Sequence, residues 1–125
     1  MTLHNTRYIP SVVALAAVVA LSLLPIGPPQ LLRGMSLLDK WTHLIMYGAL
    51  SSVLLIDRRL NGAKMQWILV TILVAALGAL LEVGQYFLPY RTFEWLDMLA
   101  NALGAILGTA LTAAVLCFLN TNRKP

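Results

Sequence analysis

The chain has 125 residues, of which 59% are apolar and only 11% are charged, with a mean hydropathy of +0.79 and a formal net charge of +4. Soluble domains are about 45–50% apolar and about 25% charged, so this composition excludes a disordered tail, a coiled coil and a water-soluble enzyme. The nine basic residues are spread between apolar segments, which argues against a nucleic-acid partner and is typical of charges that flank membrane segments. One cysteine, Cys117, excludes an internal disulfide and a cysteine-based zinc site.

Four apolar runs follow one another along the chain, and a helix needs about 20 apolar residues to cross a membrane. The predicted transmembrane helices are 8–24, 37–56, 65–88 and 95–119. The segments between them are rich in proline, glycine or charge, as loops are. We therefore expect an all-α fold, a four-helix integral membrane bundle that forms one domain over residues 1–125. A cleavable signal peptide is the alternative for the first run, but the segment after it offers no small-residue cleavage site.

Basic residues are distributed unequally over the two faces of this bundle. Six lie on the face that carries both termini: Arg7, Arg58, Arg59, Lys64, Arg123 and Lys124. Three lie on the opposite face: Arg33, Lys40 and Arg91. The positive-inside rule therefore predicts that both termini are cytoplasmic.

Polar side chains gather in the outer halves of the last three predicted helices and in the loop before the last. A charge inside a membrane helix costs about 2.5–3.5 kcal/mol on insertion scales, so these groups must face the bundle interior, a partner or water. They form the predicted polar pocket: Asp39, Lys40, His43, Tyr47, Glu82, Gln85, Arg91, Glu94, Asp97 and Asn101. Below them, Gly104 and Gly108 have the spacing of small residues at membrane helix contacts and are predicted to serve helix packing.

Several of these residues also have a purely structural interpretation. Asp39 and Glu94 occupy positions where acids cap helices, and Glu82 needs a cationic partner, for which Arg91 or Lys40 is the natural candidate. His43 can relay protons or bind a metal, but a hydrogen-bonded structural histidine is the simpler reading, and too few further ligands are evident for a zinc site. No metal and no cofactor are therefore expected. The aromatic residues near the outer boundary are expected to anchor the bundle at the membrane interface: Trp41, Tyr86, Tyr90 and Trp95.

Three segments in sequence carry a family resemblance. The run from Asp39-Lys40 through His43 to Tyr47 resembles the D-K-x-x-H-x-x-x-Y signature of VanZ-like membrane proteins. The segment Glu82 to Arg91 resembles the family's E-x-x-Q-x-x-x-P-x-R pattern, and Asp97 to Gly108 resembles its closing D-x-x-x-N-x-x-G motif. The resemblance implies a small four-helix domain in the bacterial plasma membrane. The best-known relative is associated with resistance to the glycopeptide teicoplanin.

Three functions are compatible with these observations. In the leading hypothesis the outward pocket binds a membrane lipid, a lipid-linked envelope precursor or an amphiphilic drug such as a glycopeptide, with Arg91 contacting an anion. The alternative is a membrane hydrolase or transferase that acts on a lipid-linked substrate with Glu82, Asp97 and His43 as acid and base groups. An ion-coupled transporter ranks third, and a homo-oligomer stays open. The absence of an established catalytic motif from the sequence favours a function other than catalysis.

Overall fold

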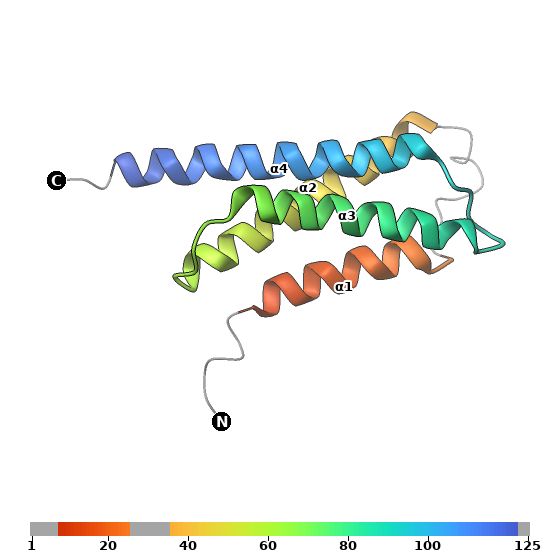
Figure 1. Ribbon diagram of the computed structural model, residues 1–125, viewed down its shortest axis with the longest axis horizontal. Helices are drawn as coiled ribbons and strands as arrows, with labels where there is room; N and C mark the ends of the chain where they lie inside the picture. Colours follow the sequence, from red (N-terminus) through yellow and green to blue (C-terminus); the bar gives the residue numbers. More distant parts are fainter. Residues whose placement is uncertain (1–7, 26–35, 123–125) are drawn as a thin grey trace, which may run out of the picture.

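A computed structural model describes residues 8–25 and 36–122, which form four α-helices that run alternately up and down the bundle (Figure 1). The helices are α1 (Ile9–Leu23), α2 (Ser36–Leu60), α3 (Trp67–Tyr86) and α4 (Trp95–Thr121). The predicted all-α fold of four helices is confirmed. The start of α1, the α2–α3 connection and the end of α4 lie at one end of the bundle, and the α3–α4 loop lies at the other (Figure 1). We call these the α2–α3 end and the α3–α4 end.

Helix boundaries differ from the predicted ones where local backbone chemistry overrides the apolar pattern. α2 continues past its predicted end at Ile56, through the charged residues 57–59, to Leu60. It is closed by Gly62, whose φ of +67° is readily adopted only by glycine. There Ala63 N–H donates to Arg58 O and Gly62 N–H to Arg59 O, the paired bonds that close a helix at a left-handed residue. α3 ends at Tyr86, shortly before Pro89, because the residue before a proline disfavours helical geometry.

The outer surface of the bundle is strongly apolar. α3 and α4 are each long and apolar enough to cross a membrane, whereas α1 has 15 residues and is shorter than a usual span. Large apolar side chains such as Ile68, Leu80 and Leu111 are exposed along α3 and α4, and soluble proteins rarely expose apolar surface on this scale. The chain is therefore a membrane protein with two to four helical spans. Arg7, Arg33, Arg123 and Lys124, on which the predicted orientation partly rests, lie outside the described residues.

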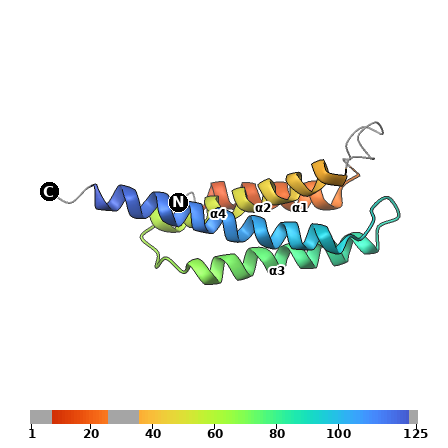
Figure 2. The ribbon, with the colours of Figure 1, turned by 90° about the horizontal axis from the view of Figure 1, so that it is seen from above.

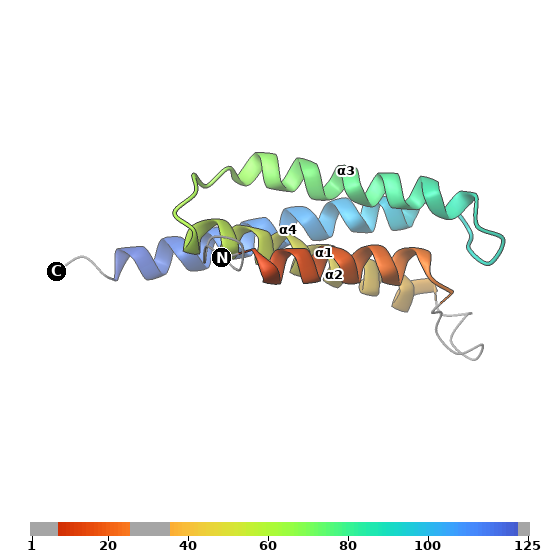
Figure 3. The same ribbon diagram turned by 90° about the horizontal axis from the view of Figure 1, so that it is seen from below.

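α4 runs between α2 and α3 (Figures 2 and 3) and packs most closely against α2. At this contact a Cβ added to Gly104 would overlap the carbonyl of Leu44, and one added to Gly108 would overlap the backbone of Gly48. Small residues allow such backbone contact, which supplies the van der Waals energy that holds membrane helices together. Hydroxyl pairs add interhelical hydrogen bonds nearer the α2–α3 end, at 2.9 Å between Thr71 and Thr109 and 2.9 Å between Thr112 and Ser52.

The amino end of α1 is fastened to the carboxyl end of α2. The backbone N–H of Ser11 donates to Asp57 Oδ2 at 2.9 Å, and its hydroxyl donates to the same oxygen at 2.6 Å. Both residues are buried. Asp57 therefore satisfies a backbone donor that a helix start leaves without an intrahelical partner.

Candidate functional site

Lys40 joins α2 to the start of α4. Its Nζ lies 2.7 Å from Glu94 Oε2 and 2.7 Å from Asp97 Oδ1. The Asp97 side chain is 5% exposed, whereas that of Glu94 is 43% exposed. One ammonium group therefore neutralises a buried carboxylate and also holds a carboxylate that reaches the surface.

His43 is held by α4 through Asn101. His43 Nδ1 lies 2.8 Å from Asn101 Oδ1, and the Asn101 amide nitrogen donates to the carbonyl of Gly78 in α3 at 3.4 Å. A Cβ at Gly78 would stand 2.7 Å from the Cβ of Asn101, so a glycine is needed for this close approach. Tyr47 is buried one turn below His43, with its ring nearly parallel to the imidazole at a centroid distance of 6.4 Å.

Glu82 does not pair with Arg91 or Lys40, and that expectation was wrong. Its Oε1 accepts a hydrogen bond from the backbone N–H of Glu94 at 3.0 Å, and the residue is only 1% exposed. Glu94 stands at the N-cap position of α4, but its own side chain makes no capping hydrogen bond and binds Lys40 instead. Asp39 lies inside the first turn of α2, which begins at Ser36, and is therefore not its N-cap.

Arg91 and Gln85 serve the carboxyl end of α1. Arg91 Nη2 donates to the carbonyls of Leu21 and Leu24 at 2.9 and 3.0 Å, and Gln85 Nε2 donates to that of Ser22 at 2.7 Å. The hydroxyl of Tyr90 donates to Leu23 O at 2.7 Å, a role that its reading as an interfacial anchor missed. These three side chains satisfy four carbonyls that no intrahelical donor reaches, which matters most in lipid, where water cannot do so.

Apart from Tyr47, which lies one turn deeper, the remaining residues of the predicted pocket form one group, which we call the acidic cluster. Its members are Asp39, Lys40, His43, Glu82, Glu94, Asp97 and Asn101. Of the three proposed acid and base residues, His43 and Asp97 face each other, with Nε2 and Oδ2 3.8 Å apart, whereas Glu82 is bonded to the start of α4.

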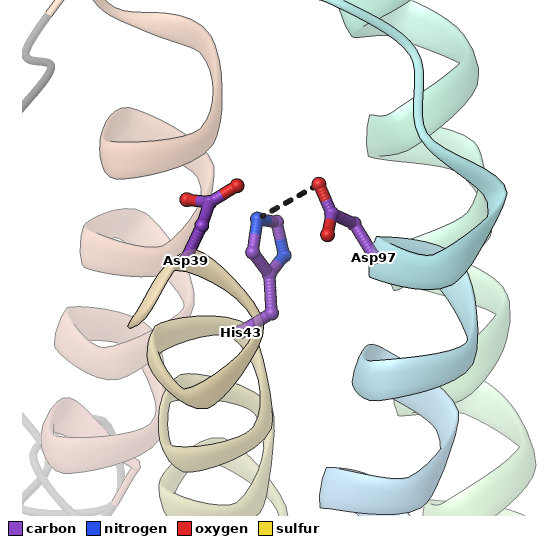
Figure 4. Close-up of side chains that lie close together, drawn as sticks. All are labelled: Asp39, His43 and Asp97. Carbon is purple, nitrogen blue, oxygen red and sulfur yellow. Dashed lines mark ion pairs between the residues drawn. The ribbon is translucent and has the colours of Figure 1, made fainter. Parts of the chain in front are cut away.

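Asp39, His43 and Asp97 point toward one another at the α3–α4 end (Figure 4). One ligand atom from each side chain lies within 4.8 Å of the other two. His43 and Asp97 are buried, and Asp39 is exposed. Within the part of the chain that the structure describes, the acidic cluster thus brings four carboxylates together with one ammonium group, that of Lys40, while the guanidinium of Arg91 is bound to α1.

Two apolar grooves lie elsewhere on the bundle. One, of about 330 Å³, runs between α3 and α4 and is lined by residues such as Trp67, Ile72 and Ile106. The other, of about 530 Å³, follows α1 from Val12 to Leu24. No residue of the acidic cluster lines either groove, so a ligand of the cluster would approach its exposed rim, Asp39 and Glu94.

The interhelical role of Asp57 was missed from the sequence. Asp57 is the one acidic residue of the chain that lies outside the predicted pocket. This isolated position was the sequence signal that could have indicated a separate structural role. Its partner Ser11 carries no comparable signal within its apolar run.

The geometry agrees with the family pattern seen in the sequence. The model of the VanZ/LLP1 family matches residues 1–118 of the chain. No curated protein and no solved structure matches it. With nearly its whole length covered, the chain belongs to the VanZ/LLP1 family.

Proposed function

We propose that the chain is a membrane-embedded binding module whose acidic rim engages the cationic or hydroxyl-bearing headgroup of an amphiphile. A membrane lipid, a lipid-linked envelope precursor and an amphiphilic drug all belong to this class of ligand. The proposal takes the α3–α4 end to be extracytoplasmic, as the distribution of basic residues predicts.

The observation that carries this proposal is the imbalance of charge in the acidic cluster. Four carboxylates face one ammonium group, and an oxygen of Asp39 lies within 4.8 Å of one of Asp97. Like charges at this distance repel each other, and the fold gains nothing from leaving them uncompensated. A site that keeps unbalanced charge at its surface is suited to a ligand of opposite sign.

The contacts of Arg91 and Lys40 support a cationic or hydroxyl-bearing ligand rather than an anion. An anion contact through Arg91 was expected, but this guanidinium is bound to the carbonyls of α1. Lys40 is shared between Glu94 and Asp97. Among residues 36–122, the Lys40 ammonium and the Arg91 guanidinium are therefore both engaged. The carboxylate of Glu94, whose side chain is 43% exposed, supplies the contact to an amine or a hydroxyl group.

Lipid binding to the purified chain tests this proposal. Phosphatidylethanolamine, which carries an amine, and phosphatidylglycerol, which does not, are titrated against the parent and against Glu94→Gln. We expect the parent to prefer the amine-bearing lipid and Glu94→Gln to lose that preference, because glutamine can still accept from Lys40 but carries no charge. Asp57→Asn, the matched loss of a carboxylate at the α2–α3 end, should retain it. Equal binding of the two lipids by the parent would contradict the proposal.

An effect on drug susceptibility would follow if the ligand were a glycopeptide or its envelope target. Expression of the parent in a teicoplanin-susceptible bacterium should then raise the inhibitory concentration, and expression of Glu94→Gln to the same level should not. If the parent and Glu94→Gln raised the inhibitory concentration equally, the effect on susceptibility would not depend on the acidic rim.

A further inference from the structure

We propose that Asp39, His43 and Asp97 bind a first-row divalent transition-metal ion of the Zn²⁺ type at the α3–α4 end of the bundle. This inference goes beyond the headgroup-binding function, because the three side chains supply the ligands without an amphiphile.

The three side chains converge from two helices. Asp39 and His43 are one helical turn apart on α2, and Asp97 reaches them from α4 (Figure 4). Their ligand atoms lie within 4.8 Å of one another. Ligands at about 2.0–2.2 Å from a tetrahedral zinc ion are roughly 3.4 Å apart, so only a small contraction is needed. Asp39 is exposed and can close this difference by rotating its side chain.

The imidazole of His43 is prepared for this role by Asn101. The Asn101 amide nitrogen donates to Gly78 O, which leaves its oxygen facing His43 Nδ1 at 2.8 Å. Nδ1 therefore carries the proton, and the lone pair of the neutral ring is on Nε2. Histidines that bind metals are oriented in this way, by donating their other N–H to an oxygen.

Nε2 of His43 faces the two carboxylates and makes no hydrogen bond within residues 8–25 and 36–122. His43 is buried, with 8% of the residue and 11% of its side chain exposed. Its nearest charged neighbour is Asp97 Oδ2 at 3.8 Å, another acceptor. In the neutral ring, the Nε2 lone pair of His43 faces carboxylate oxygens, and a cation between them would stabilise this arrangement. The buried imidazole distinguishes the group from an ordinary cluster of acids.

Asp97 divides its two oxygens between different partners. Oδ1 accepts from Lys40 at 2.7 Å, and Oδ2 is the oxygen on the side of His43. Lys40 thus orients the carboxylate and leaves one oxygen available. One imidazole and two carboxylates suit Zn²⁺ and its first-row neighbours better than they suit Ca²⁺ or Mg²⁺, which prefer ligand sets made of oxygen alone.

Metal titration of the full-length chain tests the proposal. Cys117→Ser serves as the background, because the thiol near the end of α4 is exposed and can itself bind zinc. The protein carries no histidine tag and is held in detergent free of amine-bearing lipid. Zn²⁺ binding is measured by calorimetry and Co²⁺ binding by its visible absorption, in the background and with Asp39→Asn, His43→Gln or Asp57→Asn added.

We expect one ion per chain, affinity at least tenfold lower in Asp39→Asn, no Co²⁺ spectrum in His43→Gln, and unchanged binding in Asp57→Asn. Asp39 is exposed and its substitution should not disturb folding, so that variant decides the matter even if His43→Gln misfolds. Equal affinity in all variants, or the absence of Zn²⁺ binding from the background protein, would overturn the proposal. Stronger binding of Mg²⁺ than of Zn²⁺ would overturn the assignment to a transition metal. Because no amine-bearing lipid is present, failure here would leave the headgroup proposal standing.

Discussion

Asp57 at the carboxyl end of α2 caps α1 at Ser11, with one carboxylate oxygen accepting both the backbone N–H and the hydroxyl of that residue. The other end of α1 is capped by side chains of α3 and the α3–α4 loop. α1 has 15 residues, and polar contacts at both of its ends fix its position along the bundle.

Asp57→Asn should lower the free energy of unfolding by about 1–3 kcal/mol, because a buried donor loses a charged acceptor. Ser11→Ala removes only the hydroxyl bond and should cost about 1 kcal/mol. Unfolding in a denaturing detergent measures both, and the double variant should cost less than their sum, since the residues share one interaction. Additive costs would show that the two residues act independently.

Arg91→Ala should release the last turn of α1, because the carbonyls of Leu21 and Leu24 lose their donor. We expect a loss of about 1–3 kcal/mol and faster hydrogen exchange at Leu24, whose N–H closes the final turn on Ala20. Tyr90→Phe is the milder comparison, as it removes one hydroxyl and keeps the ring. Parent-like exchange at the end of α1 in Arg91→Ala would show that the guanidinium is dispensable there.

Gly108→Ala should destabilise the α2–α4 contact by about 1–3 kcal/mol, because its methyl group meets the backbone of Gly48, which cannot move aside. Gly84→Ala on α3 is the matched control. A Cβ at that position meets only the flexible side chain of Leu23 at 3.8 Å, and alanine is the better helix former, so this variant should be neutral or slightly more stable. Thermal unfolding in detergent compares the two, and equal stability would rule out the close backbone contact.

The four helices could be predicted because apolar length and turn-forming residues are local properties of the sequence. The exact ends of α2, at Ser36 and Leu60, could not be predicted. Beyond its apolar segment this helix carries polar and charged residues, and there the apolar pattern gives no signal. The grouping of polar residues near one end followed from helical spacing. Their pairing did not, because it depends on rotation and depth of each helix: Arg91 is bound to α1 rather than to Glu82, and Glu82 is bound to a backbone N–H of Glu94.

Carboxylate oxygens of Asp39 and Asp97 lie within 4.8 Å of each other, and Asp39 is the most direct probe of whether this site is kept for a cation. As an acid in the first turn of α2, Asp39 should stabilise the helix by about 0.3–1 kcal/mol if it has only a structural role. If the carboxylate of Asp39 is instead kept for a cation, it repels that of Asp97 when no cation is bound. Asp39→Asn should then stabilise the protein, because residues kept for function often reduce stability.

The decisive measurement is the melting temperature of Asp39→Asn against the parent, in detergent at low salt and with metal removed. We expect Asp39→Asn to melt about 2–5 °C higher than the parent. A melting temperature lower than that of the parent would contradict it, and would make Asp39 an ordinary acid at the start of a helix.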